Sequence, residues 1–361
     1  MVDRTALLEL IVLAAIAGEH VLVIGPPGTA KSEAARRISK LLGGRYFEYL
    51  LGRFTEPAEI FGPIDLQKLR AGVVETNVRG MLPEAEVAFL DEVFRGSTAI
   101  LNALLSILNE RKFHGGTTIH EVPLRVCIGA SNELPSDESL AAFADRFLIQ
   151  IHVEPVSDAL LEELLATADR PDRVAATERS VPNLGDLDAL RDRAGEVSLT
   201  QVRPALADAV RVLRLEGIEL SDRRIVRIQR LLGAAAALDD RDHAELGDLW
   251  PIFYAIPGAD QQQRARELLR DRLANSTSAS LPAAAELASS GPLVRAARLL
   301  ESGRALLEDQ APTLDAASIN LRLEGIAREI DASFHRNQRP AELDALRQTI
   351  IDHLADRAEQ T

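Results

Sequence analysis

The sequence has little of several features that define other classes of protein. It holds a single cysteine, Cys127, so a disulfide framework is excluded and a reducing compartment is favoured. It contains no run of about 18 apolar residues of the kind that spans a membrane. The amino-terminal sequence MVDRTALLEL also lacks the charged and then apolar pattern of a secretion signal. These absences predict a cytoplasmic protein without membrane insertion.

The chain also lacks an excess of positive charge, because its formal net charge is −14 at pH 7. A strongly acidic balance argues against a protein whose main task is to coat nucleic acid or an anionic membrane. The 361 residues are 46% hydrophobic, which is enough to bury a large core. A chain of this length is expected to form about two or three domains.

What the sequence does contain begins with an apolar run over residues 21–24, followed by GPPGTAKS and a helical pattern. This order is typical of a buried parallel strand that leads into a phosphate-binding loop. Backbone N–H groups and the positive end of the helix dipole would face nucleotide phosphates, Lys31 would reach the β- and γ-phosphates, and Ser32 would ligate Mg²⁺. The predicted nucleotide-binding residues are Gly25, Pro26, Pro27, Gly28, Thr29, Ala30, Lys31 and Ser32.

One position departs from the usual pattern G-x-x-x-x-G-K-[ST]. Ala30 stands where the second glycine is expected, and alanine tolerates fewer backbone conformations than glycine does. For this segment alone, the alternative to a phosphate loop is a tight turn between a strand and a helix.

Two other apolar runs end in polar residues. Asp91 and Glu92 follow residues 87–90, and Asn132 follows the run 124–130. Asp91 would hold hydrated Mg²⁺, Glu92 would polarise the attacking water, and Asn132 would orient that water or contact the γ-phosphate. Ligands lie beyond the carboxyl ends of parallel strands, so these residues are expected near the phosphate loop. Ordinary strand-end and turn chemistry is the alternative for each residue taken singly.

Strand and helix patterns alternate as far as residue 153, which predicts an α/β fold with a right-handed parallel sheet. Hairpins are predicted over residues 65–76 and 113–123, and Ser221 is the expected cap of a helix within the helical region 199–275. The predicted organisation is an α/β nucleotide-binding part over 1–170, a connector and α-helical lid over 171–275, a Ser/Ala-rich linker over 276–292, and a three-helix bundle over 293–361.

The motifs GPPGTAKS, Asp91-Glu92, Ser131-Asn132 and Asp145-Arg146-Phe147, in this order and spacing, resemble those of the AAA+ ATPases. The stretches YFEYLLGRFTEPAEIFGPIDL, NERKFHGGTTIHEVPLR and SDRR are similar to the MoxR group, most closely to its regulatory ATPase variant A (RavA) branch. The resemblance covers about residues 1–275. GPPGxAKS is normal in that branch, which accounts for Ala30. The tail resembles the RavA bundle only loosely and leaves too few residues for its β-rich insertion.

The resemblance implies a Mg²⁺-dependent ATPase with an AAA+ core, a helical lid and a carboxyl-terminal bundle. It gives Glu92 the catalytic role and Asn132 the sensor 1 role. Arg146 would be the arginine finger, acting on the neighbouring subunit's γ-phosphate in a ring, expected to be a hexamer. Arg223 would be sensor 2 and act within its own chain, with Arg224 as the alternative if the helix register differs by one. The two hairpins would be the helix-2 insert and the pre-sensor-1 hairpin.

By resemblance, the leading function is chaperone-like remodelling or activation of a protein partner that carries a von Willebrand factor A (VWA) domain. The first alternative is a nucleic-acid motor, because related hairpin-bearing AAA+ proteins are helicases. Hairpins that move along DNA need Lys or Arg for phosphate contacts. The first predicted hairpin offers Lys68 and Arg70, but the second, over residues 113–123, contains neither, so nucleic acid is not the expected partner. The second alternative is a nucleotide-gated scaffold in which slow hydrolysis times assembly.

Overall fold

The computed structural model describes residues 4–135, 137–156, 164–165, 184–274, 276–289, 299–300, 303–307, 316–333 and 340–358. The chain forms two compact units. The described residues before residue 156 and those of 184–288 belong to the larger unit, and the carboxyl-terminal helices belong to the smaller one. Within the described residues, no helix combines the length and the apolar character needed to cross a membrane.

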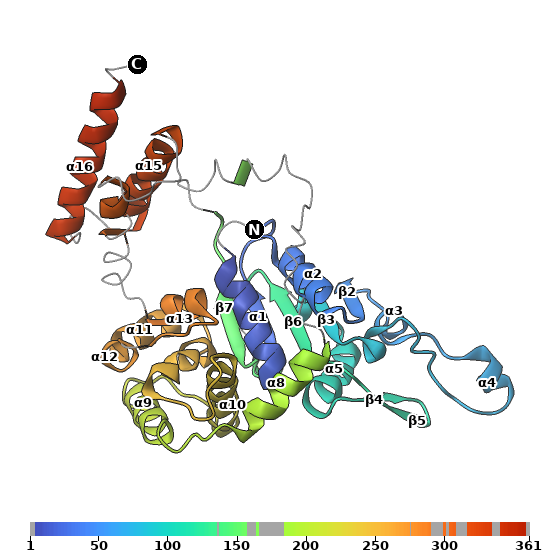
Figure 1. The fold of residues 1–361 in the computed structure, drawn as a ribbon. Helices are drawn as coiled ribbons and strands as arrows, with labels where there is room; N and C mark the ends of the chain where they lie inside the picture. Colours follow the sequence, from blue (N-terminus) through green and yellow to red (C-terminus); the bar gives the residue numbers. More distant parts are fainter. Residues whose placement is uncertain are drawn as a thin grey trace. The chain divides into compact units, whose positions relative to one another are not determined.

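The larger unit contains a parallel sheet, a hairpin and the helices around them (Figure 1). Its elements, in chain order, are α1 (Thr5–Ala17), β1 (Val21–Ile24), α2 (Lys31–Leu42), β2 (Tyr46–Leu50), α3 (Pro57–Phe61), α4 (Leu66–Arg70), η1 (Leu82–Glu84), β3 (Val87–Asp91), η2 (Val93–Arg95), α5 (Thr98–Glu110), β4 (Lys112–Gly115), β5 (Thr118–Glu121), β6 (Val126–Ser131), α6 (Glu138–Ala144), β7 (Ile149–His152), α8 (Leu184–Glu196), α9 (Arg203–Leu215), α10 (Asp222–Leu238), η4 (Leu246–Ala255), α11 (Ala259–Leu268), α12 (Arg270–Leu273) and α13 (Pro282–Ser289).

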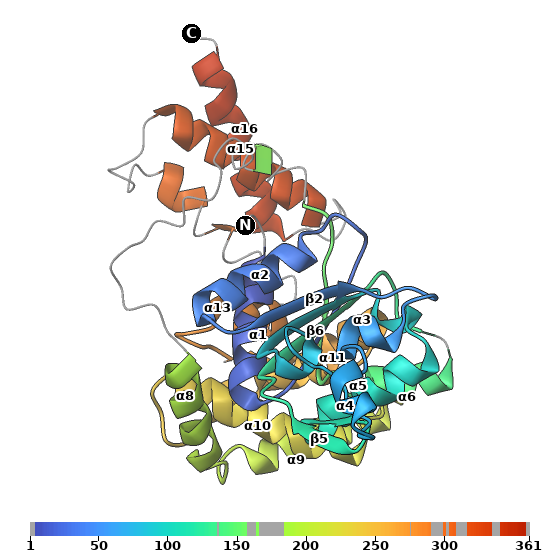
Figure 2. The same cartoon turned by 90° about the vertical axis from the view of Figure 1, so that its right-hand side faces the viewer.

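The sheet has the strand order β2-β3-β6-β1-β7, and all of its neighbouring strands are parallel. The strands are short and apolar because both faces are covered by helices. Helices α1 and α2 lie together on one face, and α5 and α6 pack on the other, as Figures 1 and 2 show. On the α5 side, Leu22, Ala88 and Cys127 share a buried cluster with Leu104 and Phe143. The predicted α/β fold is therefore confirmed.

Every strand of this sheet ends at the same edge, because the strands are parallel. We call it the carboxyl edge, and the edge where the strands begin the amino edge. The carboxyl edge receives the phosphate loop after β1 and the polar residues after β3 and β6. The amino edge receives the carboxyl-terminal end of α5 and the residues that precede β1 and β7. The two edges carry the two halves of the candidate site.

The hairpin predicted over residues 65–76 is wrong. The segment forms the one-turn helix α4 at the end of a projecting arm, labelled in Figures 1 and 2. The Asp65 carboxylate caps this helix by accepting hydrogen bonds from the backbone N–H groups of Gln67 (2.9 Å) and Lys68 (3.1 Å). Only the base of the arm is antiparallel, with a single bridge between Ile64 and Thr76. The second predicted hairpin is confirmed as β4 and β5, an antiparallel pair.

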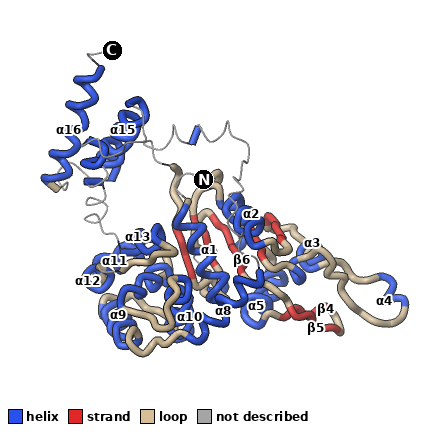
Figure 3. Tube along the Cα trace, in the orientation of Figure 1, coloured by secondary structure: helices blue, strands red, loops and turns tan. Residues whose placement is uncertain are grey.

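The linker predicted over residues 276–292 is wrong for residues 282–289, because α13 lies there and packs on the lid. Ala284, Ala285 and Ala288 are buried, and the Tyr254 hydroxyl donates a hydrogen bond to the Ala284 carbonyl (2.7 Å). Small alanine side chains let α13 approach the lid closely. The Ser/Ala-rich composition alone was therefore misleading, because it indicated a linker. Figure 3 shows α13 as helix.

The smaller unit contains α15 (Ala316–Ser333) and α16 (Ala341–Ala358), which pack through Leu323, Ile330, Leu343 and Ile350. Helical residues 303–307 precede them. The predicted helix breaks near Pro312 and Arg339 lie outside the described residues.

Candidate functional site

The phosphate loop joins β1 to α2 with a backbone that few residues could adopt. The Gly25 N–H donates to the Ser131 carbonyl (3.0 Å), which ties the loop to β6. A Cβ on Gly25 would lie 2.1 Å from the Val153 carbonyl oxygen, so only glycine fits there. Gly28 has a positive φ of 81°. The loop is thus shaped by backbone contacts with both neighbouring strands.

Ala30 adopts a left-handed conformation, with φ 60° and ψ 28°, at the residue before α2. This explains why the usual motif has glycine there, since a residue with a Cβ pays about 1–2 kcal/mol in that region. The sequence correctly singled out the position. The structure shows that alanine takes up this left-handed conformation between β1 and α2.

Lys31 is the first residue of α2 and is buried, with 7% of its surface exposed. Its Nζ donates to the carbonyl oxygens of Gly25 (2.6 Å) and Pro26 (3.0 Å), so the ammonium lies across the inside of the loop. Burial lowers the pKa of Lys31, and the nearby carboxylates of Asp91 and Glu92 oppose that shift. A cation held at this place is available to a bound phosphate.

Arg4 braces the same loop and was not found by sequence reasoning. It is 5% exposed, its Nε donates to the Thr29 carbonyl (3.0 Å), and its Nη2 donates to the Glu154 carbonyl (2.7 Å). The guanidinium therefore joins the phosphate loop to the residues after β7. No motif marks an arginine that precedes an apolar helix, so only the fold reveals it.

Glu92 follows β3 and is held by two side chains. Its Oε1 accepts a hydrogen bond from Asn132 Nδ2 (2.9 Å), and its Oε2 pairs with Arg95 Nε (3.2 Å). Its backbone is left-handed, with φ 50°, and its N–H donates to the Asp91 carboxylate (3.0 Å). The structure thus brings Asp91, Glu92 and Asn132 together beside the phosphate loop. Arg95 is a second participant that the sequence did not indicate.

The residues predicted to hold Mg²⁺ have suitable chemistry. Ser32 supplies a hydroxyl and Asp91 a half-buried carboxylate, both hard oxygen donors of the kind Mg²⁺ prefers. Among the described residues, no group of three His, Cys, Asp or Glu side chains could hold a metal by itself. Mg²⁺ at nucleotide sites usually takes its other ligands from phosphate oxygens and water.

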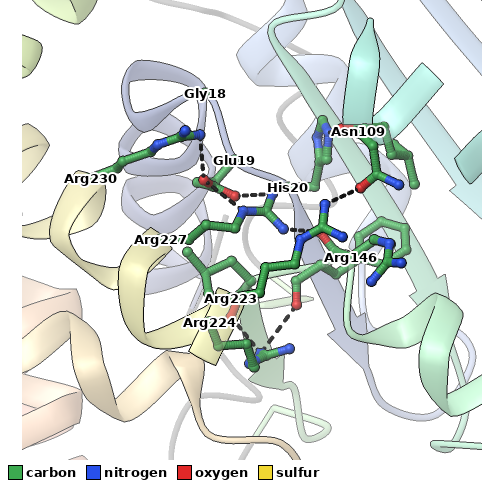
Figure 4. Close-up of polar contacts among 12 residues, drawn as sticks. Gly18, Glu19, His20, Asn109, Arg146, Arg223, Arg224, Arg227 and Arg230 are labelled. Carbon is green, nitrogen blue, oxygen red and sulfur yellow. Dashed lines mark hydrogen bonds and ion pairs between the residues drawn. The ribbon is translucent and has the colours of Figure 1, made fainter. Parts of the chain in front are cut away.

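The two arginines predicted to act on phosphate lie elsewhere, at the amino edge (Figure 4). Arg146 precedes β7 and lies 3.6 Å from the Asp145 carboxylate. Arg223 belongs to the first turn of α10 and donates to the side chain of Asn109, at the end of α5. The structure does not bring Arg223 to the phosphate loop of its own chain. The expectation that Arg223 acts within its own chain is therefore not supported by this geometry.

Arg224, the alternative to Arg223, is an anchor of the lid. It is 3% exposed and donates to the Ala255 carbonyl (2.9 Å), the Leu148 carbonyl (2.8 Å) and the Asp145 carboxylate (3.0 Å). Burial lowers its pKa, and Asp145 opposes the shift. A buried guanidinium with these partners holds α10 against the start of β7. It is not free to meet a nucleotide.

Comparisons with known proteins fit this geometry. A family model described as the MoxR domain in the MoxR-vWA-beta-propeller ternary systems matches residues 1–192. A model of an AAA lid domain matches residues 198–267. The chain belongs to the MoxR family of AAA+ ATPases.

Two relatives of this MoxR-family chain come from Methanocaldococcus jannaschii. Uncharacterized protein MJ0079 is 37% identical over 250 residues, covering 68% of this chain and 64% of the relative. Uncharacterized protein MJ0812 is 36% identical over 250 residues, covering 68% of this chain and 65% of the relative. The chain thus spans a little under two thirds of the length of these curated relatives.

A solved crystal structure from Cytophaga hutchinsonii, described as that of a candidate ATPase, resembles the chain with a TM-score of 0.60 and 17% identity. The match covers 75% of this chain and 90% of that one. At this level of identity the likeness shows the fold alone. Together with the match to the AAA lid model, this confirms the AAA+ fold that the resemblance implied.

Proposed function

We propose that this MoxR-family chain hydrolyses ATP in a ring of identical subunits, expected to be a hexamer, and that each active site is shared by two subunits. One observation carries the proposal. The phosphate loop, Glu92 and Asn132 meet at the carboxyl edge, whereas Arg146 and Arg223 lie at the amino edge of the same chain. A head-to-tail contact between two copies would place one edge against the other, and such contacts close into rings.

Within one chain, the carboxyl edge would bind ATP, and it would position and activate the water that attacks the γ-phosphate. Lys31 would leave its two loop carbonyls and pair with the β- and γ-phosphates. Mg²⁺, held by Ser32 and Asp91, would neutralise charge that develops on the phosphate oxygens. Glu92 would accept a proton from the attacking water, and Asn132, already bonded to Glu92, would fix its position.

The neighbouring chain would supply both arginines. Arg146 would act as the finger on the γ-phosphoryl group, and Arg223 would act from the neighbour instead of its own chain, because it lies beside Asn109 at the amino edge. Arginine fingers contribute about 10³–10⁵-fold to turnover in other phosphate-loop enzymes. Hydrolysis would then depend on assembly.

We further propose that the ATPase remodels or activates a protein partner with a VWA domain. The matching family model names vWA and beta-propeller components beside the MoxR domain, which supports this partner. The projecting arm also supports a protein and not a nucleic acid, because it exposes apolar side chains and its Lys68 pairs with Glu75. The exposed apolar residues are Leu66, Leu69, Val73 and Val74. Membership of the RavA branch and a cytoplasmic location stay predictions.

The shared site can be tested by mixing two inactive variants. Lys31→Ala removes the phosphate-loop cation, and Arg146→Ala removes the finger, so each variant alone should lose nearly all turnover. In an equal mixture, random assembly gives ~25% of interfaces an intact loop on one side and an intact finger on the other. ATPase activity in the mixture should therefore rise to about a quarter of the wild-type value.

The control is a mixture of Lys31→Ala with Glu92→Gln, since both changes fall on the same edge. Each interface then contains one damaged carboxyl edge, so activity should not return. If the Lys31→Ala and Arg146→Ala mixture stays inactive while both variants still assemble, the site is not shared in this way.

A further inference from the structure

The larger unit contains a cavity of about 540 Å³ at the amino edge, away from the phosphate loop. Its walls come from the end of α1, the end of α5, and helices α8 and α10. Figure 4 shows the part of it between α1 and α10. Leu108 and Val226 contribute apolar surface to the wall of the cavity. Most of the polar lining is guanidinium, from Arg111, Arg191, Arg223, Arg227 and Arg230.

These positive charges are only partly compensated. The fully buried Glu19 carboxylate pairs with Arg227 and with Arg230 (3.3 Å). Asp222 lines the cavity but pairs with Arg214, which does not. In the described part of the chain, no carboxylate forms an ion pair with Arg111 or Arg191. Even if Glu19 and Asp222 are both counted against them, the five guanidinium groups leave an excess of at least three positive charges.

Arg111 and Arg191 both line the cavity beside Gly18. Arg111 Nη2 donates to the Gly18 carbonyl (2.9 Å), and Arg191 Nη2 lies 2.8 Å from where a Cβ on Gly18 would be. Burial, and then the charge of Arg191, lower the pKa of Arg111 to about 10. Two like charges are thus held together in a partly desolvated place. An anion bound between them would relieve that repulsion.

We propose that this cavity is a second phosphate-binding site, which takes a multiply charged phosphoryl anion such as pyrophosphate without any help from the phosphate loop. The charge excess matches an anion of this class better than a single carboxylate, which would leave at least two positive charges uncompensated. Guanidinium groups that converge from several helices suit phosphoryl oxygens, because each planar fork can make two parallel hydrogen bonds. The inference does not rest on the proposed hydrolysis.

The test uses isothermal titration of the full chain with pyrophosphate, in a Lys31→Ala background that disables the phosphate loop. This chain should bind one pyrophosphate, with an affinity that falls as salt is raised. Adding Arg191→Gln should weaken binding at least ~10-fold, because a hydrogen bond to a charged group is lost. Arg211→Gln on α9 removes the same charge from an exposed position outside the cavity, and should change the affinity less than ~2-fold.

Thermal unfolding separates loss of binding from loss of fold. Without ligand, Arg191→Gln should keep the Tm or raise it, since the change removes repulsion with Arg111. With pyrophosphate, the Tm should rise for the Lys31→Ala chain and stay constant once Arg191→Gln is added.

Two results would overturn the inference. One is no binding by the Lys31→Ala chain at millimolar pyrophosphate, which would mean that phosphate reaches this edge only on a neighbour's loop. The other is equal binding with and without Arg191. Neither result affects recovery of activity in mixtures of Lys31→Ala and Arg146→Ala, so this inference and the shared active site can fail separately.

Discussion

Single residues at the carboxyl edge adopt backbone conformations that their side chains do not favour. Ala30 and Glu92 both have positive φ, 60° and 50°. Such conformations cost free energy and persist where surrounding contacts fix them, as at functional sites. In the phosphate loop those contacts are the Arg4 guanidinium on Thr29 and the Lys31 ammonium on Gly25. These contacts hold the loop in a backbone conformation that alanine alone does not favour.

Substitutions at Ala30 should report this strain. Ala30→Gly removes the Cβ and should leave the free energy of unfolding unchanged or raise it by up to about 1 kcal/mol. Ala30→Val places a β-branched residue at positive φ, and should cost about 2 kcal/mol and weaken ATP binding. Urea unfolding followed by the single tryptophan, Trp250, gives the stability, and titration with a fluorescent ATP analogue gives the affinity.

The control is Ala99→Val, at an exposed position of α5 with helical backbone, which should cost less than about 1 kcal/mol. Equal costs at the two positions would show that the left-handed backbone of Ala30 is not a constraint in solution.

Residue roles could be predicted from sequence where a motif fixes spacing along the chain. Lys31, Asp91, Glu92 and Asn132 follow apolar strands, and parallel pairing brings strand ends together, so their closeness was predicted, while their roles stay predictions. Arg4 and Arg95 lie outside any motif, and their contacts depend on how separate segments pack. The expectation that Arg223 lies near the phosphate loop of its own chain is not supported for the same reason. The position of the lid relative to the sheet is set by tertiary contacts, such as those of Arg224.

At the scale of elements, the strands were predicted well and two connecting segments were not. In the arm, Ala71-Gly72 between apolar residues indicated a hairpin, but the cap at Asp65 satisfies the first N–H groups of a helix and stabilises α4. In α13, serine and alanine indicated a linker, yet alanine has high helix propensity and its small side chain permits close packing. Composition alone could not show that Tyr254 covers this helix.

The contact between α13 and the lid should be measurable. Tyr254→Phe removes the hydroxyl that donates to the Ala284 carbonyl, and should lower the free energy of unfolding by about 1 kcal/mol. It should also speed proteolytic cleavage within residues 276–289. Tyr49→Phe is the matched control, because that hydroxyl bonds to exposed Glu59 and water can replace it. If cleavage in the Tyr254→Phe chain stays as slow as in the wild type, this hydrogen bond does not hold α13.

At the scale of the whole molecule, the predicted site residues of the larger unit lie at two different edges of its sheet. The carboxyl edge carries the phosphate loop and carboxylates, while the amino edge carries Arg146, Arg223 and the arginine cavity. A head-to-tail contact would bring the arginines of one copy's amino edge to the phosphate loop and carboxylates of another copy's carboxyl edge. This polarity follows from the parallel sheet, which sends every strand end to the same side.

ATPase activity per chain should therefore depend on protein concentration. At low concentration the chains are separate and Glu92 works without Arg146, so activity per chain should be low. It should rise with concentration as neighbours supply the finger and level off when assembly is complete, following mass action. Steady-state ATP hydrolysis measured over a dilution series checks this, with albumin added to keep total protein constant. Arg146→Ala should stay near zero throughout, because its assembly supplies no finger. Activity per chain that is constant down to the lowest concentration, in a chain that gel filtration shows to be monomeric there, would mean that one copy completes its own site.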